Sequence, residues 1–133
     1  MNEQVTYYEN KLKYEMDPSD LFEALLNGEN VVVIDARKPE GFEAEHIPGA
    51  INLPHRTINE TTTKHFDKNV LYVAYCDGIG CNASTRAALN LAHLGFKVNE
   101  LIGGIQWWKL DGYETEGLKS THKEDELQVN CAC

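Results

Sequence analysis

The chain has 133 residues and a formal net charge of −9, so it is long enough for one domain and leaves little room for a second. Hydrophobic residues make up 42% of it and charged residues 25%, as in an ordinary globular protein with a buried core. The acidic balance argues against binding to nucleic acid or to an anionic membrane surface, because both need clustered Lys and Arg side chains. A small anion is not excluded, since backbone N–H groups can bind one locally.

The first sixteen residues are polar and charged and lack the apolar stretch of a signal peptide, and no segment has the length of a transmembrane span. We therefore expect a cytoplasmic protein whose thiols stay reduced. Its four cysteines are then expected to be catalytic, redox-active or metal-binding rather than paired in structural disulfides.

The first half of the chain predicts helices and strands in alternation. Helical spacing of apolar residues predicts a lead-in helix over residues 1–16 that packs on the domain. Asp17, followed by a proline, marks the start of a second helix, and Gly28 marks its end. The β-branched run 31–34 predicts a strand buried on both faces, as in a parallel sheet. The elements expected next are a short helix over 39–45, a short strand over 50–53 and a helix over the Thr-rich segment 57–66.

The second half repeats this alternation. A strand is predicted over 70–75, the strongest helix over 82–94, a further strand over 98–101 and a last short helix over 105–110. Strands that alternate with helices at this interval imply a parallel sheet covered on both faces. From Lys119 onward the chain becomes polar and charged, which predicts a flexible tail.

One cysteine, Cys76, ends the predicted strand 70–75, which is where ligands sit in parallel α/β sheets. Two glycines follow it, and a helix begins near Asn82 or Ser84. A loop curled around a thiol directs backbone N–H groups inward, and the helix adds the positive end of its dipole. Both effects favour a thiolate, so Cys76 is a candidate nucleophile for a group that arrives on an anionic donor. The alternative is a buried cysteine that acts only as a small hydrophobic residue.

Four segments form a pattern in a fixed order: 31–37 running on into 39–42, then 46–54, the cysteine loop 75–86, and 94–96 through 103–108. Together they resemble the rhodanese-like (sulfurtransferase) family, in which such segments occur in the same order. The resemblance covers residues 17–117 and implies an α/β fold with a central, mostly parallel five-stranded sheet flanked by helices on both faces. It also implies that Cys76 takes a sulfane sulfur from a donor as a persulfide and passes it to a thiol acceptor, without a metal or organic cofactor.

The same resemblance assigns roles to further residues. The anion-binding loop comprises Asp77, Gly78, Ile79, Gly80, Cys81, Asn82, Ala83 and Ser84. The residues expected to be structural are Asp35, Arg37, His46, Gly103, Gly104 and Trp108. The expected limits are 1–16 for the lead-in helix, 17–118 for the rhodanese-like domain and 119–133 for the tail.

The loop departs from the commoner family pattern in length and charge. Ser84 fills the position of the family's Ser or Thr but lies eight residues after Cys76, so the loop is about two residues longer. It contains Asp77 and no basic residue before Arg86. An acid beside a thiol repels anionic donors and raises the thiol pKa, so a weakly charged persulfide is a better donor than thiosulfate. The phosphatases and arsenate reductases of the same fold carry an Arg where this chain has Asn82, so their chemistry is not expected.

A second loop cysteine, Cys81, lies five residues after Cys76. It is either a resolving thiol that forms a disulfide with Cys76 or a residue that only fills space. Arg86 and the tail residues Cys131 and Cys133 are candidate accessory groups, although the cysteine spacing is not that of a structural zinc site. Two functions therefore stay open: a sulfurtransferase, or a module of the same fold that binds a partner protein or senses oxidants through a Cys76–Cys81 disulfide.

Overall fold

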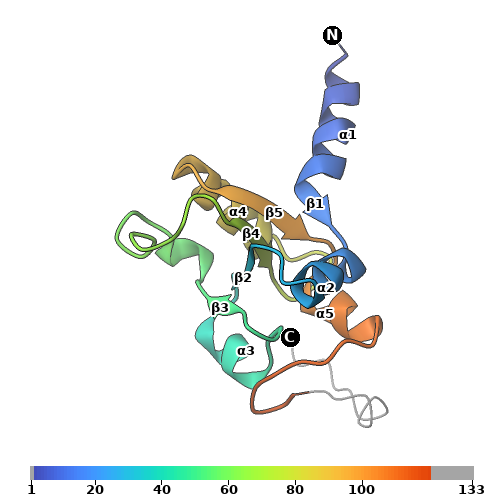
Figure 1. Cartoon of the computed structure of the whole chain (residues 1–133), viewed down its shortest axis with the longest axis vertical. Coiled ribbons are helices and arrows are strands. Elements are labelled where there is room, and N and C mark those ends of the chain that lie inside the picture. The colour runs from blue at the N-terminus through green and yellow to red at the C-terminus, as the bar shows by residue number, and fades with distance from the viewer. Residues whose placement is uncertain (1, 121–133) are drawn as a thin grey trace.

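The computed structural model describes residues 2–120, which form a five-stranded sheet with strand order β1-β5-β4-β2-β3 (Figure 1). Every pairing in the sheet is parallel. The strands are β1 (Glu15–Met16), β2 (Val31–Asp35), β3 (Ile51–Asn52), β4 (Leu71–Tyr75) and β5 (Lys97–Leu101). The predicted α/β class and parallel sheet are thereby confirmed. Asp35 at the end of β2 pairs in register with Tyr75 at the end of β4, so these two carboxyl ends lie side by side.

Helices cover both faces of the sheet, as predicted. They are α1 (Glu3–Tyr14), α2 (Pro18–Leu26), α3 (Pro39–Ala44), the 3₁₀ helix η1 (His55–Thr57), α4 (Ala83–His93) and α5 (Gly104–Leu110). Successive residues of a strand point to opposite faces, so Val73 and Ala74 of β4 belong to different cores. Ala74 packs in one cluster with Leu91 of α4, and Val73 packs in the other with Leu21 of α2 and Trp108 of α5.

The start and end of α2 follow the predicted signals. The Asp17 carboxylate accepts a hydrogen bond from the Asp20 N–H at 2.9 Å, which satisfies a free donor of the first turn. Gly28 follows the helix with a φ of 68°. These local signals fix where α2 begins and stops.

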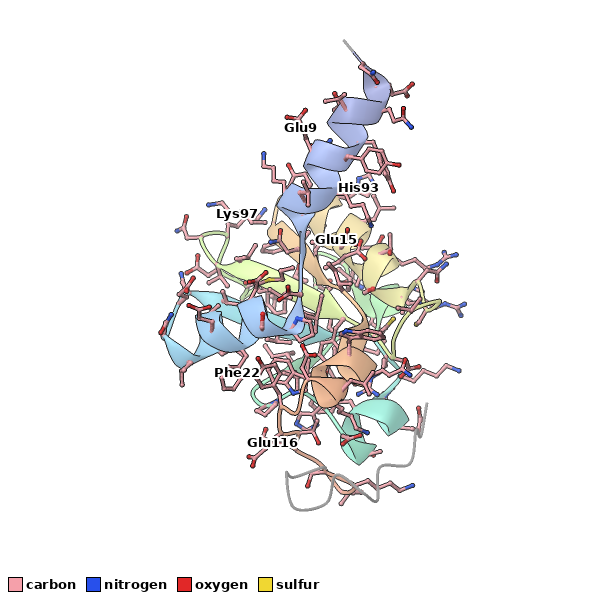
Figure 2. All side chains as sticks on the ribbon, turned by 90° about the vertical axis from the view of Figure 1, so that its right-hand side faces the viewer. Glu9, Glu15, Phe22, His93, Lys97 and Glu116 are labelled. Atoms are coloured by element: carbon pink, nitrogen blue, oxygen red, sulfur yellow. The ribbon has the colours of Figure 1, made fainter. Side chains whose placement is uncertain are left out.

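The lead-in helix forms, but the prediction that it packs on the domain is wrong. None of the residues of α1 is buried, and the helix extends away from the sheet (Figures 1 and 2). Met16, expected on the helix, lies in β1, which pairs with Leu101 at the edge of the sheet. Because the chain leaves the helix at Tyr14 to enter this strand, α1 is directed out of the body.

The prediction of a helix over 57–66 is also wrong. Beyond η1 this segment is a series of turns, held by its own side chains. The Asn59 carboxamide oxygen accepts from the Thr62 N–H at 2.9 Å, and the Thr63 hydroxyl donates to the Asn59 carbonyl at 2.8 Å. Such side-chain bonds compete with helical backbone bonds, and β-branched threonines favour the turn.

At the end of the described chain, the N–H groups of Leu118 and Lys119 donate to the carbonyls of Glu43 and Ala44. Most of the predicted tail, with Cys131 and Cys133, lies outside the described residues. Within residues 2–120, no helix has both the length and the apolar character needed to cross a bilayer.

Candidate active site

Cys76 directly follows β4 at the carboxyl end of the sheet and is 2% exposed. The start of helix α5 holds the backbone there. The Ile105 N–H donates to the Cys76 carbonyl at 3.0 Å, and the Gln106 N–H donates to the Asp77 carbonyl at 2.9 Å. Two N–H groups of the first turn of α5 therefore fix the beginning of the cysteine loop.

The glycine pair before α5 makes this contact possible. Gly103 and Gly104 have φ values of 76° and 59°, in the left-handed region that glycine tolerates. A Cβ added to Gly104 would lie 3.0 Å from the carbonyl carbon of Cys76 and still closer to the carbonyl oxygen. The two glycines thus let α5 pack directly against the end of β4.

The loop after Cys76 turns back over the sulfur. The Cys81 N–H donates to the Gly78 carbonyl at 3.2 Å, and Gly80 has a φ of 95° within this turn. The Cys76 thiol donates to the Cys81 carbonyl, with 3.3 Å between sulfur and oxygen. Ile79 at the loop tip is 76% exposed. The arrangement leaves Cys76 covered and Cys81 half-buried above it.

The protonation state of Cys76 differs from the prediction of a thiolate. Burial, and after it the neighbouring Cys81 side chain, raise the pKa of the Cys76 thiol to about 11. The Ser84 N–H and hydroxyl, in the first turn of α4, hydrogen-bond the sulfur and lower its pKa. The helix start therefore contributes as expected, but burial outweighs it, and the sulfur of this closed loop is a thiol at neutral pH.

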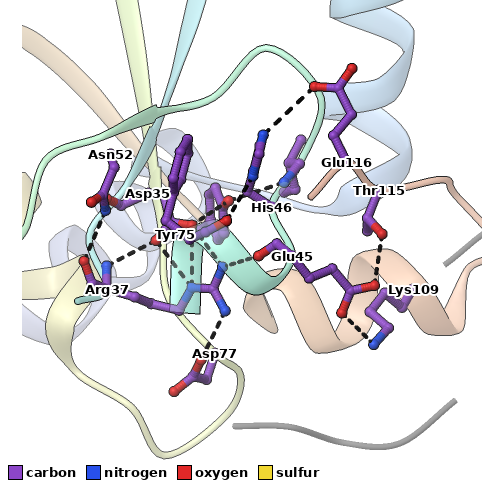
Figure 3. A network of polar contacts seen from close by, with 12 residues as sticks. Asp35, Arg37, Glu45, His46, Asn52, Tyr75, Asp77, Lys109, Thr115 and Glu116 are labelled. Carbon is purple, nitrogen blue, oxygen red and sulfur yellow. Dashed lines mark hydrogen bonds and ion pairs between the residues drawn. The ribbon is translucent and has the colours of Figure 1, made fainter. Parts of the chain in front are cut away.

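A buried ion pair lies beside the loop, at the end of β2 (Figure 3). Asp35 is fully buried and Arg37 is 8% exposed, with 2.7 Å between Arg37 Nη2 and Asp35 Oδ2. The Tyr75 hydroxyl donates to the same carboxylate oxygen at 2.7 Å. Burial disfavours the Arg37 charge, yet the hydrogen bonds and charge of Asp35 hold the Arg37 pKa above its ordinary value.

The same guanidinium reaches the cysteine loop. Arg37 Nη1 lies 3.3 Å from Asp77 Oδ1, so the Asp77 carboxylate is paired with a cation (Figure 3). Arg37 also donates to the Glu45 carbonyl. The raised pKa of Cys76 stems chiefly from burial and Cys81, and not from Asp77 as the sequence suggested.

The other motif residues have contacts of their own. His46 Nδ1 lies 2.8 Å from the Phe42 carbonyl oxygen, and the imidazole stacks on the Phe42 ring. Trp108 is buried and donates to the Glu114 carbonyl at 2.9 Å. His46 therefore links the segment after α3 back to that helix, and Trp108 links α5 to the segment that follows it.

The remaining loop residues lie at the start of α4. Asn82 occupies the N-cap position but makes no capping hydrogen bond with its side chain. Its carboxamide oxygen instead accepts from Arg86 Nε at 3.3 Å. Arg86 is exposed, and its side chain is directed along the helix to Asn82.

Sequence reasoning missed two groups at the site, Tyr75 and Gln106. Tyr75 anchors the Asp35 carboxylate, and its hydroxyl also accepts from the Ile47 N–H at 3.1 Å. Tyr75 directly precedes Cys76 on a strand that the sequence predicts to be buried. Because a buried tyrosine hydroxyl needs a hydrogen-bond partner, the sequence did contain a signal for this contact. Gln106 packs on Gly78, and its position after the glycine pair gave no comparable sign.

Comparison with known proteins places this geometry in a class. The model of the rhodanese-like domain matches residues 19–111, and the chain belongs to that family. Thiosulfate sulfurtransferase GlpE of Coxiella burnetii is 36% identical over 87 residues, which cover 64% of this chain and 78% of that protein. The crystal structure of BH2092 from Bacillus halodurans is similar with a TM-score of 0.83 and 39% identity, over 96% of this chain and 98% of the other.

A relative of another kind also matches. The HTH-type transcriptional regulator Rv0324 of Mycobacterium tuberculosis is 34% identical over 83 residues, or 62% of this chain. The match spans 36% of that regulator, so the chain corresponds to about a third of its length.

Proposed function

We propose that this chain is a sulfurtransferase that passes sulfane sulfur through a persulfide on Cys76. The observation that carries the proposal is the position of Cys76 at the end of β4, under a loop and beside the first turn of α4. Membership of the rhodanese-like family and the likeness to a thiosulfate sulfurtransferase support it.

The proposed reaction has two displacements at sulfur. Cys76 attacks the outer sulfur of a donor persulfide, the donor S–S bond breaks, and the donor leaves as a thiol that carries the Cys76 proton. An acceptor thiol then attacks the outer sulfur, the Cys76 S–S bond breaks, and the acceptor's proton passes to Cys76, which is regenerated as a thiol. Ser84 lies in the first turn of α4, and its N–H and hydroxyl favour the sulfur anion through which both steps pass.

Charge favours a weakly charged persulfide as donor, whether a small molecule or a protein. The chain carries a net charge of −9, and Asp77 adds a carboxylate next to Cys76 in the loop. Arg37, the cation nearest to that carboxylate, is itself paired with buried Asp35. A dianion such as thiosulfate therefore meets little uncompensated positive charge at this site.

The test is the intact mass of the reduced chain after incubation with glutathione persulfide. A Cys81→Ser chain in a Cys131→Ser/Cys133→Ser background is used, so that Cys76 is the sole thiol. We expect the gain of one sulfur atom, which a further Cys76→Ser exchange abolishes. No gain with glutathione persulfide or with thiosulfate would contradict the proposal. If the chain with all four cysteines also takes up no sulfur but loses two thiols reversibly in mild peroxide, it is a thiol sensor instead.

A further inference from the structure

The two loop cysteines lie against each other in a way that a single-cysteine transfer does not need. The Cys76 thiol donates to the Cys81 carbonyl, with 3.3 Å between sulfur and oxygen, and the Cys81 side chain is near enough to raise the pKa of the Cys76 thiol. Cys76 is 2% exposed, whereas Cys81 is half-buried and reachable from solvent. An external acceptor must open the loop to reach the sulfur, but Cys81 is already beside it.

We propose that Cys81 resolves the Cys76 persulfide, so that the chain releases the carried sulfur as sulfide and is reduced again by an external dithiol. This activity rests on the proposed persulfide on Cys76. It is a second fate of that persulfide beside transfer to an acceptor thiol: its substrates are a low-molecular-weight persulfide and a dithiol reductant, and its product is sulfide.

The resolving step itself balances without a further reactant, and only the later reduction of the disulfide needs the external dithiol. Cys81 loses its proton and attacks the inner sulfur, Cys76 Sγ, and the Cys76–Cys81 disulfide forms as the bond to the outer sulfur breaks. The outer sulfur leaves with the electron pair and takes up the proton as hydrogen sulfide. The two cysteines are oxidised by two electrons and the sulfane sulfur is reduced by two. The external dithiol then reduces the disulfide and becomes a disulfide itself.

The local backbone can close such a bond at small cost. Cys81 precedes α4, which begins at Ala83, so its movement breaks no hydrogen bond within the helix. The turn it belongs to is held by the bond from the Cys81 N–H to the Gly78 carbonyl, and Gly80 lies within it. A glycine-containing turn adjusts its backbone more readily than a strand or helix does.

The position of Cys81 also gives it the advantage of an intramolecular reaction. Groups held in contact react as though at very high concentration, so a tethered thiol outcompetes a dilute external one. Among residues 2–120, Cys76 and Cys81 are the free cysteines, and no other described thiol competes with this pair.

The experiment follows one turnover with glutathione persulfide, in the Cys131→Ser/Cys133→Ser background and in that background with Cys81→Ser or Cys81→Ala. With Cys81 present we expect one sulfide released per chain, loss of both thiols and a mass two hydrogens below the reduced chain. Both Cys81 variants keep the added sulfur, with a persulfide lifetime at least about tenfold longer. Agreement between the Ser and Ala variants shows that the thiol matters and not the size of the side chain.

Other outcomes separate this inference from the proposed function. If the chain with Cys81 keeps its persulfide as long as the Cys81 variants do, the resolving step is refuted while transfer through Cys76 stands. If the Cys81 variants take up no sulfur at all, the persulfide itself is refuted, and the resolving step with it.

Discussion

Gly104→Ala tests whether the start of α5 fixes the cysteine loop. The new Cβ meets two costs: a left-handed φ of 59°, about 1–2 kcal/mol for a residue with a Cβ, and overpacking against the Cys76 carbonyl, about 1–3 kcal/mol. The free energy of unfolding in urea is therefore expected to fall by about 2–5 kcal/mol. Sulfur uptake by Cys76 falls as well, because the strand end must shift away from α5.

The matched control is Gly28→Ala, at the end of α2. Gly28 has a similar φ of 68°, but a Cβ there would meet nothing within 4 Å. The free energy of unfolding of this variant falls only by the cost of the left-handed backbone, about 1–2 kcal/mol, and sulfur uptake stays unchanged. Equal losses of stability in the two variants, or unchanged uptake in Gly104→Ala, would refute the reasoning, because the contact with Cys76 would then cost nothing.

Three further predictions concern charges at the site. Arg37→Gln leaves the buried Asp35 carboxylate without its cation and lowers the free energy of unfolding by about 3–5 kcal/mol in urea titration; a loss below about 1 kcal/mol would contradict the pairing. Asp77→Asn removes one negative charge near the sulfur and speeds sulfur uptake from thiosulfate about fivefold at low salt. Uptake from cysteamine persulfide, whose ammonium group balances the persulfide anion, and uptake at high salt stay unchanged. Alkylation of Cys76 by iodoacetamide, followed by peptide mass analysis, rises about tenfold per pH unit between about pH 7 and 10, because burial holds its pKa at about 11. Since the unfolded thiol ionises near its ordinary pKa, the stability that the buried neutral thiol contributes is fully present below about pH 9 and is lost as the pH rises to about 11. A plateau in the rate of alkylation below pH 9 would contradict the raised pKa of Cys76.

The fold was predictable where one local signal dominated. The β-branched run of β2 and the strand β4 were located almost to the residue, because buried parallel strands are apolar on both faces. The two-residue strand β1 had no such signal, since its place depends on pairing with β5. The turns of 57–66 carry threonines whose own hydrogen bonds, such as Thr62 Oγ1 to the Thr57 carbonyl at 2.6 Å, decide the backbone.

The position of Cys76 in the candidate site was predictable from the sequence, and its electrostatics were less so. The strand end and the glycines placed Cys76 correctly beside the start of α4. Its pKa could not be predicted, because burial and the approach of Cys81 depend on how the loop turns back. The pairing of Asp77 with Arg37 joins residues forty positions apart, which only the register of β2 and β4 brings together.

Both tryptophans of the chain lie on α5, the helix whose first N–H groups hold the Cys76 and Asp77 carbonyls. Trp108 is 2% exposed, while Trp107 is 42% exposed. Intrinsic fluorescence therefore reports on the seating of this one helix. A reaction at the loop that lifts α5 would shift the emission of Trp108 to longer wavelength, whereas the emission of Trp107, which is already 42% exposed, would change less. The protein carries an optical probe of its own cysteine loop, which needs no added label.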